Sequence, residues 1–168
     1  MTNDDLRARQ APIKESYRAD ANAARITLRA EATPESSSMA CSVDLGRAIY
    51  AAQAHAGVGG AGTAACSGDL LLAALAACAQ ITCQMVAEAA GVAVESIGVE
   101  VEGDLDLRGT LGVSKDVPVG FETIRVRFDV KAPDADERSL ARLKRLTEQY
   151  CVVFQTLAAP PPIETSWV

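Results

Sequence analysis

Aromatic residues are scarce in this sequence: three Phe, three Tyr and one Trp make up about 4% of 168 residues. A buried core must therefore consist mainly of Ala, Leu, Val and Ile, and because alanine buries little area, we expect self-association to add burial. His55 is the only histidine, and none of the five cysteines forms a Cys-x-x-Cys pair. Zinc and iron–sulfur sites need tighter clusters of ligands, so we predict no metal and no cofactor.

The sequence also lacks basic clusters and long apolar runs. Its net charge is −6, and no basic run carries interleaved aromatics, which argues against a nucleic-acid partner. Charged residues begin at Asp4, where a signal peptide would be apolar, and the longest apolar run, Leu70–Ala79, is too short to cross a bilayer. We expect a soluble, cytoplasmic protein with no membrane partner.

The first half of the chain predicts a polar N-terminal arm over residues 1–20 and then a hairpin. Apolar and polar residues alternate over 23–32 and again over 39–46, with turn residues between them, as in two antiparallel strands. A glycine-rich loop follows over 55–68. Its Gly57–Gly62 run matches GxGxxG, but the next helix is expected only after Ser67, so a loop at an active site or interface is favoured over a dinucleotide site.

A helix is predicted from Ser67 to about Ala90. Ser67 suits the N-cap, Asp69 the first turn, and Gly91 the C-terminal stop. The first half of this helix is apolar on every side, so it must be buried all round. One sheet covers only one side, and a second helix, possibly from another subunit, would cover the other.

The second half of the chain repeats the strand–strand–helix order. Alternating apolar residues predict strands over 97–107 and 124–131, with a loop at 109–120 between them. A helix follows over 133–150, then a short apolar segment over 151–159, and residues 163–168 suit a last strand. The order β-β-α-β-β-α-β predicts one α+β domain with antiparallel strands over residues 21–168.

The cysteines are the residues most able to carry chemistry, and we expect them to be reduced in the cytoplasm. From the residues alone, Cys78 reads as a small core residue, since it lies beyond the strongest effect of the helix N-terminus and needs another cation. Cys66 is the other candidate for a reactive thiolate, because it lies beside the predicted N-cap and a helix N-terminus stabilises a thiolate. Cys83 and Cys41 read as structural. Cys151 suits either core packing or a nucleophile or resolving thiol that caps a short helix.

Two segments resemble the OsmC/Ohr family of osmotically inducible and organic hydroperoxide resistance proteins. These are Ser67–Cys78, which opens the long helix, and Tyr150–Val153, about seventy residues later. The resemblance covers roughly residues 20–168. It implies an intertwined homodimer, with antiparallel β-sheets wrapped around long central helices and active sites at the dimer interface.

The resemblance also implies a reaction. Cys78 would attack a hydrophobic organic hydroperoxide and become a sulfenic acid, Cys151 would condense with it to a disulfide, and an external dithiol would reduce that disulfide. The alternatives are a non-catalytic relative that binds a small apolar ligand in the interfacial cleft, or a thiol redox sensor.

The sequence departs from the family pattern at two positions. Gly68 lies ten residues before Cys78, where the hydroperoxide reductases carry a glutamate, with Asp69 beside it; Val152 follows Cys151, where a proline is usual. The family's activating arginine comes from an N-terminal segment, and Arg47 and Arg29 are the candidates for it in this chain.

Overall fold

The computed structural model describes residues 3–20, 25, 31–34, 40–44 and 48–167. Along the chain the elements are α1 (Asn3–Ala19), β1 (Glu31–Pro34), β2 (Ala40–Asp44), β3 (Ile49–Gln53), the 3₁₀ turn η2 (Ala56–Val58), α2 (Ser67–Ala90), β4 (Ser96–Asp104), α3 (Leu107–Thr110), β5 (Thr123–Lys131), α4 (Glu137–Tyr150) and α5 (Val152–Ala158). The chain divides into two compact units, which are described separately: residues 1–11, 74–101 and 126–168, and residues 12–73 and 102–125.

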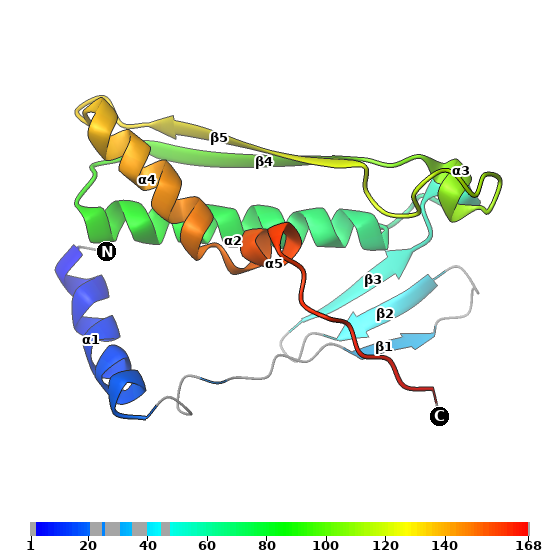
Figure 1. Cartoon of the computed structure of the whole chain (residues 1–168), viewed down its shortest axis with the longest axis horizontal. Coiled ribbons are helices and arrows are strands. Elements are labelled where there is room, and N and C mark those ends of the chain that lie inside the picture. Colours follow the sequence, from blue (N-terminus) through cyan, green and yellow to red (C-terminus); the bar gives the residue numbers. More distant parts are fainter. Residues whose placement is uncertain (1–2, 21–24, 26–30, 35–39, 45–47, 168) are drawn as a thin grey trace. The chain divides into compact units, whose positions relative to one another are not determined.

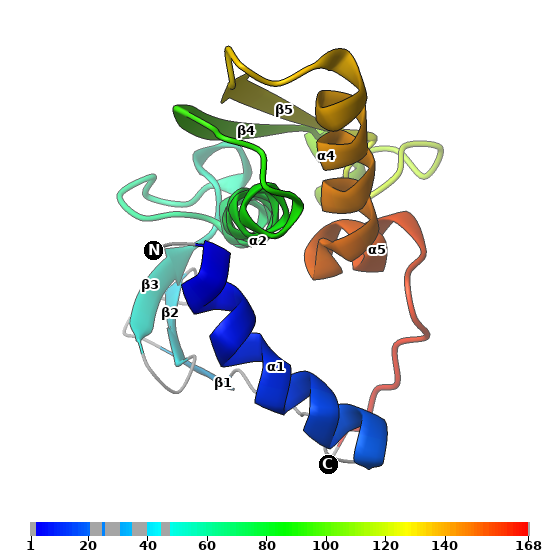
Figure 2. The same cartoon turned by 90° about the vertical axis from the view of Figure 1, so that its left-hand side faces the viewer.

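The core of the first unit forms around one stripe of α2. The buried residues Leu75, Ala79, Cys83 and Ala87 recur every four positions and so lie on one face of the helix. Cys83 and Ala87 pack with Leu143 of α4, and residues of the two long strands join them. Figures 1 and 2 show α4 and α5 on the same side of α2.

The strand portions in this unit have one buried face and one charged face. Burial alternates residue by residue along both β4 and β5, as the sequence pattern predicts. Ile97, Phe128 and Val130 face the core, while Arg127 pairs with Glu100 on the outer face at 2.8 Å. The Glu95 amide donates to the Lys131 carbonyl, so the start of β4 meets the end of β5 in an antiparallel pair.

Helix α4 begins at an aspartate cap and ends against α5. The Asp136 carboxylate accepts a hydrogen bond of 2.7 Å from the Ser139 amide, which satisfies one of the free donors of the first turn. Leu143 and Thr147, one turn apart, are the buried residues of α4. Cys151 ends α4 and stands at the N-cap position of α5, so a single residue joins the two helices.

The second unit contains the three-stranded sheet β1-β2-β3, whose neighbouring strands are antiparallel. After β3 the chain turns through η2, and the Gln53 amide bonds back to the Ala65 carbonyl at 3.0 Å. Gly60 passes so close to this turn that a Cβ would lie 1.7 Å from the Ala54 carbonyl oxygen. Only glycine fits there, and this packing requirement accounts for one glycine of the GxGxxG run.

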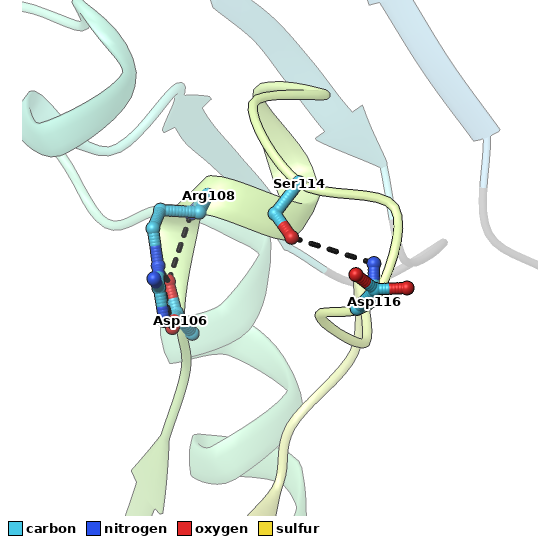
Figure 3. Close-up of polar contacts among 4 residues, drawn as sticks. All are labelled: Asp106, Arg108, Ser114 and Asp116. Atoms are coloured by element: carbon cyan, nitrogen blue, oxygen red, sulfur yellow. Dashed lines mark hydrogen bonds and ion pairs between the residues drawn. The ribbon is translucent and has the colours of Figure 1, made fainter.

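The loop between β4 and β5 is held by its own polar contacts (Figure 3). Asp106 caps α3 by accepting from the Arg108 amide at 3.0 Å, and its carboxylate also pairs with the Arg108 guanidinium. The Asp116 amide donates to the Ser114 hydroxyl at 3.4 Å. Arg125 pairs with Asp104 and Glu102 where the strands reach this loop.

The α+β class and the antiparallel strands are confirmed, and so is the helix over 67–90. Other expectations are corrected. The predicted arm over 1–20 contains helix α1, which runs through Pro12. Of the strand predicted over 23–32, residues 31 and 32 lie in β1, which continues to Pro34, and residues 23–24 and 26–30 lie outside the described residues. Strand β3 and helix α3 were not predicted.

The C-terminal segment also differs from the prediction. Residues 163–167 form no strand, and Ile163 and Trp167 are 88% and 95% exposed. A strand needs a neighbour to take its backbone hydrogen bonds, and this segment pairs with none of the described strands. The prediction of one domain over 21–168, and of sheets wrapped around helices in a dimer, stays a prediction.

Helix α2 is long and apolar enough, by length and composition, to cross a membrane. The apolar run Leu70–Ala79 has ten residues, too few by themselves to cross a bilayer. Helix α2 has 24 residues and stays mostly apolar beyond that run, so its apolar length is greater than the run alone indicates. The core helix of a water-soluble protein passes the same test. Length and composition alone therefore do not separate these two environments for α2.

Candidate functional site

The candidate site is the place where α2 meets the junction of α4 and α5, within the first unit. Cys78 projects from α2 and is half-buried, and Cys151 at the junction is 1% exposed. The Cys78 and Cys151 thiols lie close enough for each to shift the pKa of the other, although the two residues are 73 positions apart in the sequence (151 minus 78). Folding therefore brings the two cysteines of the family-based prediction together.

The surroundings of Cys78 favour its thiolate. Burial raises the pKa of the Cys78 thiol, but hydrogen bonds from the Val153 amide, the Cys151 thiol and the Thr82 hydroxyl outweigh it, so the pKa lies below its ordinary value. These donors carry no net charge, whereas the sequence led us to expect that a cation would stabilise the Cys78 thiolate. Neutral hydrogen bonds to a thiolate are an equivalent physical route to the same shift.

Cys151 has the opposite shift. Burial raises its pKa, and the neighbouring Cys78 raises it further, because a second negative charge beside the first is unfavourable. Its backbone is fully used: the amide donates to Thr147 at 3.0 Å and the carbonyl accepts from Gln155 at 2.9 Å. The pair thus consists of one thiol biased toward ionisation and one biased toward the neutral form.

Cys83 is a core residue, as predicted. It is 2% exposed, and burial raises its pKa above the ordinary value, which disfavours the thiolate. It lies five residues after Cys78 on α2, so their side chains point in directions about 140° apart. Cys41 lies on β2, and its side chain is outside the described part of the structure.

Cys66 takes the N-cap position that the sequence analysis assigned to Ser67. Its carbonyl accepts from Leu70 at 3.1 Å, closing the first helical turn, and its sulfur accepts from the Asp69 amide at 3.4 Å. Asp69 in turn accepts from the Cys66 amide at 2.8 Å, and this bond is the main reason why the pKa of Asp69 is lowered. Both side chains are therefore engaged in capping α2.

Arg47 and Arg29, the candidates for the activating arginine, lie outside the described residues. Among the arginines that the structure does describe, Arg108 and Arg125 are bound to carboxylates of the second unit, and Arg127 to Glu100. At Gly68 a Cβ would approach Phe121 and the Cys66 sulfur at 3.4 and 3.5 Å, so this position accepts a short side chain. The described residues contain no group of three or more His, Cys, Asp or Glu side chains placed to hold a metal ion.

The family model of OsmC-like proteins matches residues 60–166, and the chain belongs to this family. The resemblance stated from the two cysteine segments is thus confirmed. No curated protein sequence shows significant similarity to the chain.

Solved structures show the same fold at low sequence identity. An OsmC-like protein from Mycoplasma pneumoniae is 15% identical with a TM-score of 0.66, covering 80% of this chain and 89% of that one. An organic hydroperoxide resistance protein OsmC from Legionella pneumophila is 17% identical, with a TM-score of 0.61 and coverage of 80% and 90%. One from Elizabethkingia anophelis is 19% identical, with a TM-score of 0.60 and coverage of 81% and 91%.

Proposed function

We propose that this chain reduces organic hydroperoxides, with Cys78 as the attacking thiolate and Cys151 as the resolving thiol. The observation that carries the proposal is the contact between the two thiols together with their opposite pKa shifts. The thiolate is the nucleophile in peroxide chemistry, and a neutral partner thiol beside it is ready to condense with the product. The names of the Legionella and Elizabethkingia structures support the same activity.

The reaction proceeds in three balanced steps. The Cys78 thiolate attacks one peroxide oxygen, the O–O bond breaks, and the alkoxide takes a proton and leaves as the alcohol. The Cys78 sulfenic acid then reacts with the Cys151 thiol, forming the disulfide and one water. An external dithiol reduces this disulfide by thiol–disulfide exchange and is itself oxidised.

The residues around Cys78 favour a hydrophobic substrate. Its neighbours on α2 are alanines, Leu75 and Ile81, with Thr82 as the polar exception, and Val152 and Val153 approach it from α5. An alkyl or aryl hydroperoxide gains free energy from contact with such side chains, while hydrogen peroxide has no apolar surface to bury. The cycle needs a compartment that keeps dithiols reduced, and we therefore place the protein in the cytoplasm.

We also propose that the chain acts as a homodimer in which a second copy covers α2. Ala77, Ile81 and Met85 are exposed at four-residue spacing, on the opposite side of the helix from the buried stripe. Ile81 is 56% exposed and Met85 40%. A helix that is apolar all round requires burial on both sides, and a second α2 offers a matching surface.

The test is reduction of cumene hydroperoxide by the full-length protein with dithiothreitol as reductant. We expect turnover by the native protein and none by Cys78→Ser. In the absence of dithiothreitol, Cys151→Ser should release one equivalent of alcohol per chain and leave a sulfenic acid that dimedone traps at Cys78. Cys66→Ser and Cys83→Ser are the matched controls, and both should keep turnover.

Three results would overturn the proposal. Absence of turnover in the native protein would exclude the enzyme, and disulfide formation without turnover would point to a redox sensor. Loss of activity in Cys66→Ser alone would move the nucleophile to the N-cap of α2.

A further inference from the structure

Cys151 joins α4 to α5 as a single non-helical residue, and the chain bends there (Figures 1 and 2). Its backbone dihedrals, φ −74° and ψ 107°, are extended. The bend interrupts the series of helical hydrogen bonds, so the last carbonyls of α4 and the first amides of α5 need other partners. The bonds that these groups make decide how α5 is held against α4.

The side chain of Gln155 bridges the bend. Its amide nitrogen donates to the Glu148 carbonyl at 2.8 Å, and Glu148 lies in the last turn of α4. The backbone amide of Gln155 donates to the Cys151 carbonyl at 2.9 Å. Gln155 therefore bonds to the bend through its backbone and to α4 through its side chain.

The first amides of α5 act on the two sulfurs. No side chain caps this helix. Against the effect of burial, the Val153 amide lowers the pKa of the Cys78 thiol, and the Phe154 amide acts in the same direction on the pKa of Cys151. The remaining groups that act on Cys78 are uncharged or weakly acidic: the Cys151 thiol, the Thr82 hydroxyl and the Val152 amide. The position of α5 therefore decides how well these amides reach the sulfurs.

Stability alone gives the Gln155 side chain a small role. The residue is exposed, so its bond to Glu148 buries little apolar surface, and such a hydrogen bond exchanges for one with water at little net cost. Its geometric effect is larger, because the bond spans the bend and limits the angle between the two helices. Val153 lies only two residues before Gln155 and moves with it.

We propose that Gln155 is a positioning residue, which ties α5 to the last turn of α4 and so holds the Val153 amide and the Cys151 thiol against the Cys78 sulfur. The inference rests on the proposed function, since the two thiols give this position its meaning. Its readout is the chemistry of the thiols without any hydroperoxide, so the two proposals can fail separately.

The experiment compares the reduced native protein with Gln155→Met, which keeps the length of the side chain and removes the donor. Alkylation of Cys78 by iodoacetamide is followed as a function of pH by mass spectrometry of its peptide. We expect the pH midpoint at Cys78 to rise in Gln155→Met. The rate at neutral pH should fall about threefold, because a lost hydrogen bond lowers the thiolate fraction and the greater nucleophilicity of a more basic thiolate offsets part of this loss.

Two controls separate positioning from a general loss of structure. Gln149→Met removes another exposed glutamine from the last turn of α4, whose side chain bonds only within that helix, to Arg145 at 3.4 Å. It should leave the Cys78 midpoint unchanged. Alkylation of the buried Cys83, measured in the same samples, should be equally slow in all three proteins. An unchanged Cys78 midpoint in Gln155→Met, or faster alkylation of Cys83, would overturn the proposal.

A second measurement follows formation of the Cys78–Cys151 disulfide by diamide, which takes up the two electrons and two protons of the thiols. The disulfide should form more slowly in Gln155→Met than in the native protein and Gln149→Met, and equal rates would overturn the proposal. Turnover of cumene hydroperoxide should fall in parallel. Absence of turnover in the native protein would overturn the proposed function alone, while alkylation and diamide oxidation would still decide the role of Gln155.

Discussion

Cys66 and Asp69 cap the N-terminus of α2 reciprocally. The Asp69 amide donates to the Cys66 sulfur at 3.4 Å, and the Cys66 amide donates to the Asp69 carboxylate at 2.8 Å. Sulfur thus takes the place that a serine or threonine hydroxyl usually has in a capping box. The carboxylate also lies at the positive end of a 24-residue helix, which stabilises its charge.

Removal of this cap should destabilise the protein. We expect Asp69→Ala to lower the free energy of unfolding by about 1 kcal/mol, the usual cost of a lost capping residue. Asp134→Ala, an exposed aspartate in the turn before α4, serves as the control and should change it little. Urea denaturation followed by circular dichroism measures both.

The effect of Asp69 should depend on pH. Its pKa is lower in the folded chain than in the unfolded one, mainly through the hydrogen bond from the Cys66 amide. Its contribution is therefore present above the unfolded pKa of about 3.9 and is lost as the pH falls through the folded pKa. The stability difference between the native protein and Asp69→Ala should shrink below that pH. A difference that stayed constant down to pH 2 would contradict this account.

The thiols of Cys78 and Cys83 should ionise at different pH values. The pKa of Cys78 lies below its ordinary value and that of Cys83 above it, so Cys78 forms its thiolate at the lower pH. We expect the rate of alkylation by iodoacetamide to rise with a lower pH midpoint at Cys78. Mass spectrometry of the two peptides measures both midpoints in one sample. Because burial slows Cys83 at every pH, the midpoints, and not the rates, decide the result.

The exposed stripe of α2 should control self-association. Ile81→Glu places a charge in that stripe, and we expect it to convert the dimer to a monomer of 17.6 kDa. Gln84→Glu puts the same side chain at an exposed polar position of the same helix and is the control. Light scattering during size-exclusion chromatography measures the mass.

Two other results would contradict the dimer. A native protein that is monomeric at all concentrations would leave the stripe without a partner copy. Recovery of the native protein in the membrane fraction, with release only by detergent, would show that lipid covers α2 instead.

The core of the first unit should depend on Leu143 far more than on its neighbour Leu140. Leu143 is 3% exposed and packs against Cys83 and Ala87, while Leu140 is 36% exposed. We expect Leu143→Ala to cost about 2–3 kcal/mol, the lower part of the usual range, because the residue already borders a cavity. Leu140→Ala should cost about 1 kcal/mol or less. Equal losses in urea denaturation would show that α4 does not pack as described.

The sequence predicts best those elements whose cause is local. The α2 boundaries follow from a capping aspartate at one end and Gly91, at φ 70°, at the other. The alternation in β4 and β5 follows from one buried and one solvated face. The two cysteine segments were also enough to indicate the family.

Elements whose cause is not local could not be predicted. Strand β3 reads Ile-Tyr-Ala-Ala-Gln, which lacks alternation, and it becomes a strand because β2 pairs with it. Residues 163–168 have strand-like composition, but 163–167 pair with no described strand. The polar composition of residues 1–20 predicted an arm, yet helix α1 forms over Asn3–Ala19 and continues through Pro12.

The candidate site, like the fold, combines features with a local cause in the sequence and features that only folding produces. By itself the sequence determined which residues carry thiols, where the long helix begins and to which family the chain belongs, and its local chemistry favoured Cys66 over Cys78. The tertiary structure decided the contact between Cys78 and Cys151 and the direction of each pKa shift. Hydrogen-bond donors from α5 lie some seventy residues away along the chain, so only folding brings them to the Cys78 sulfur.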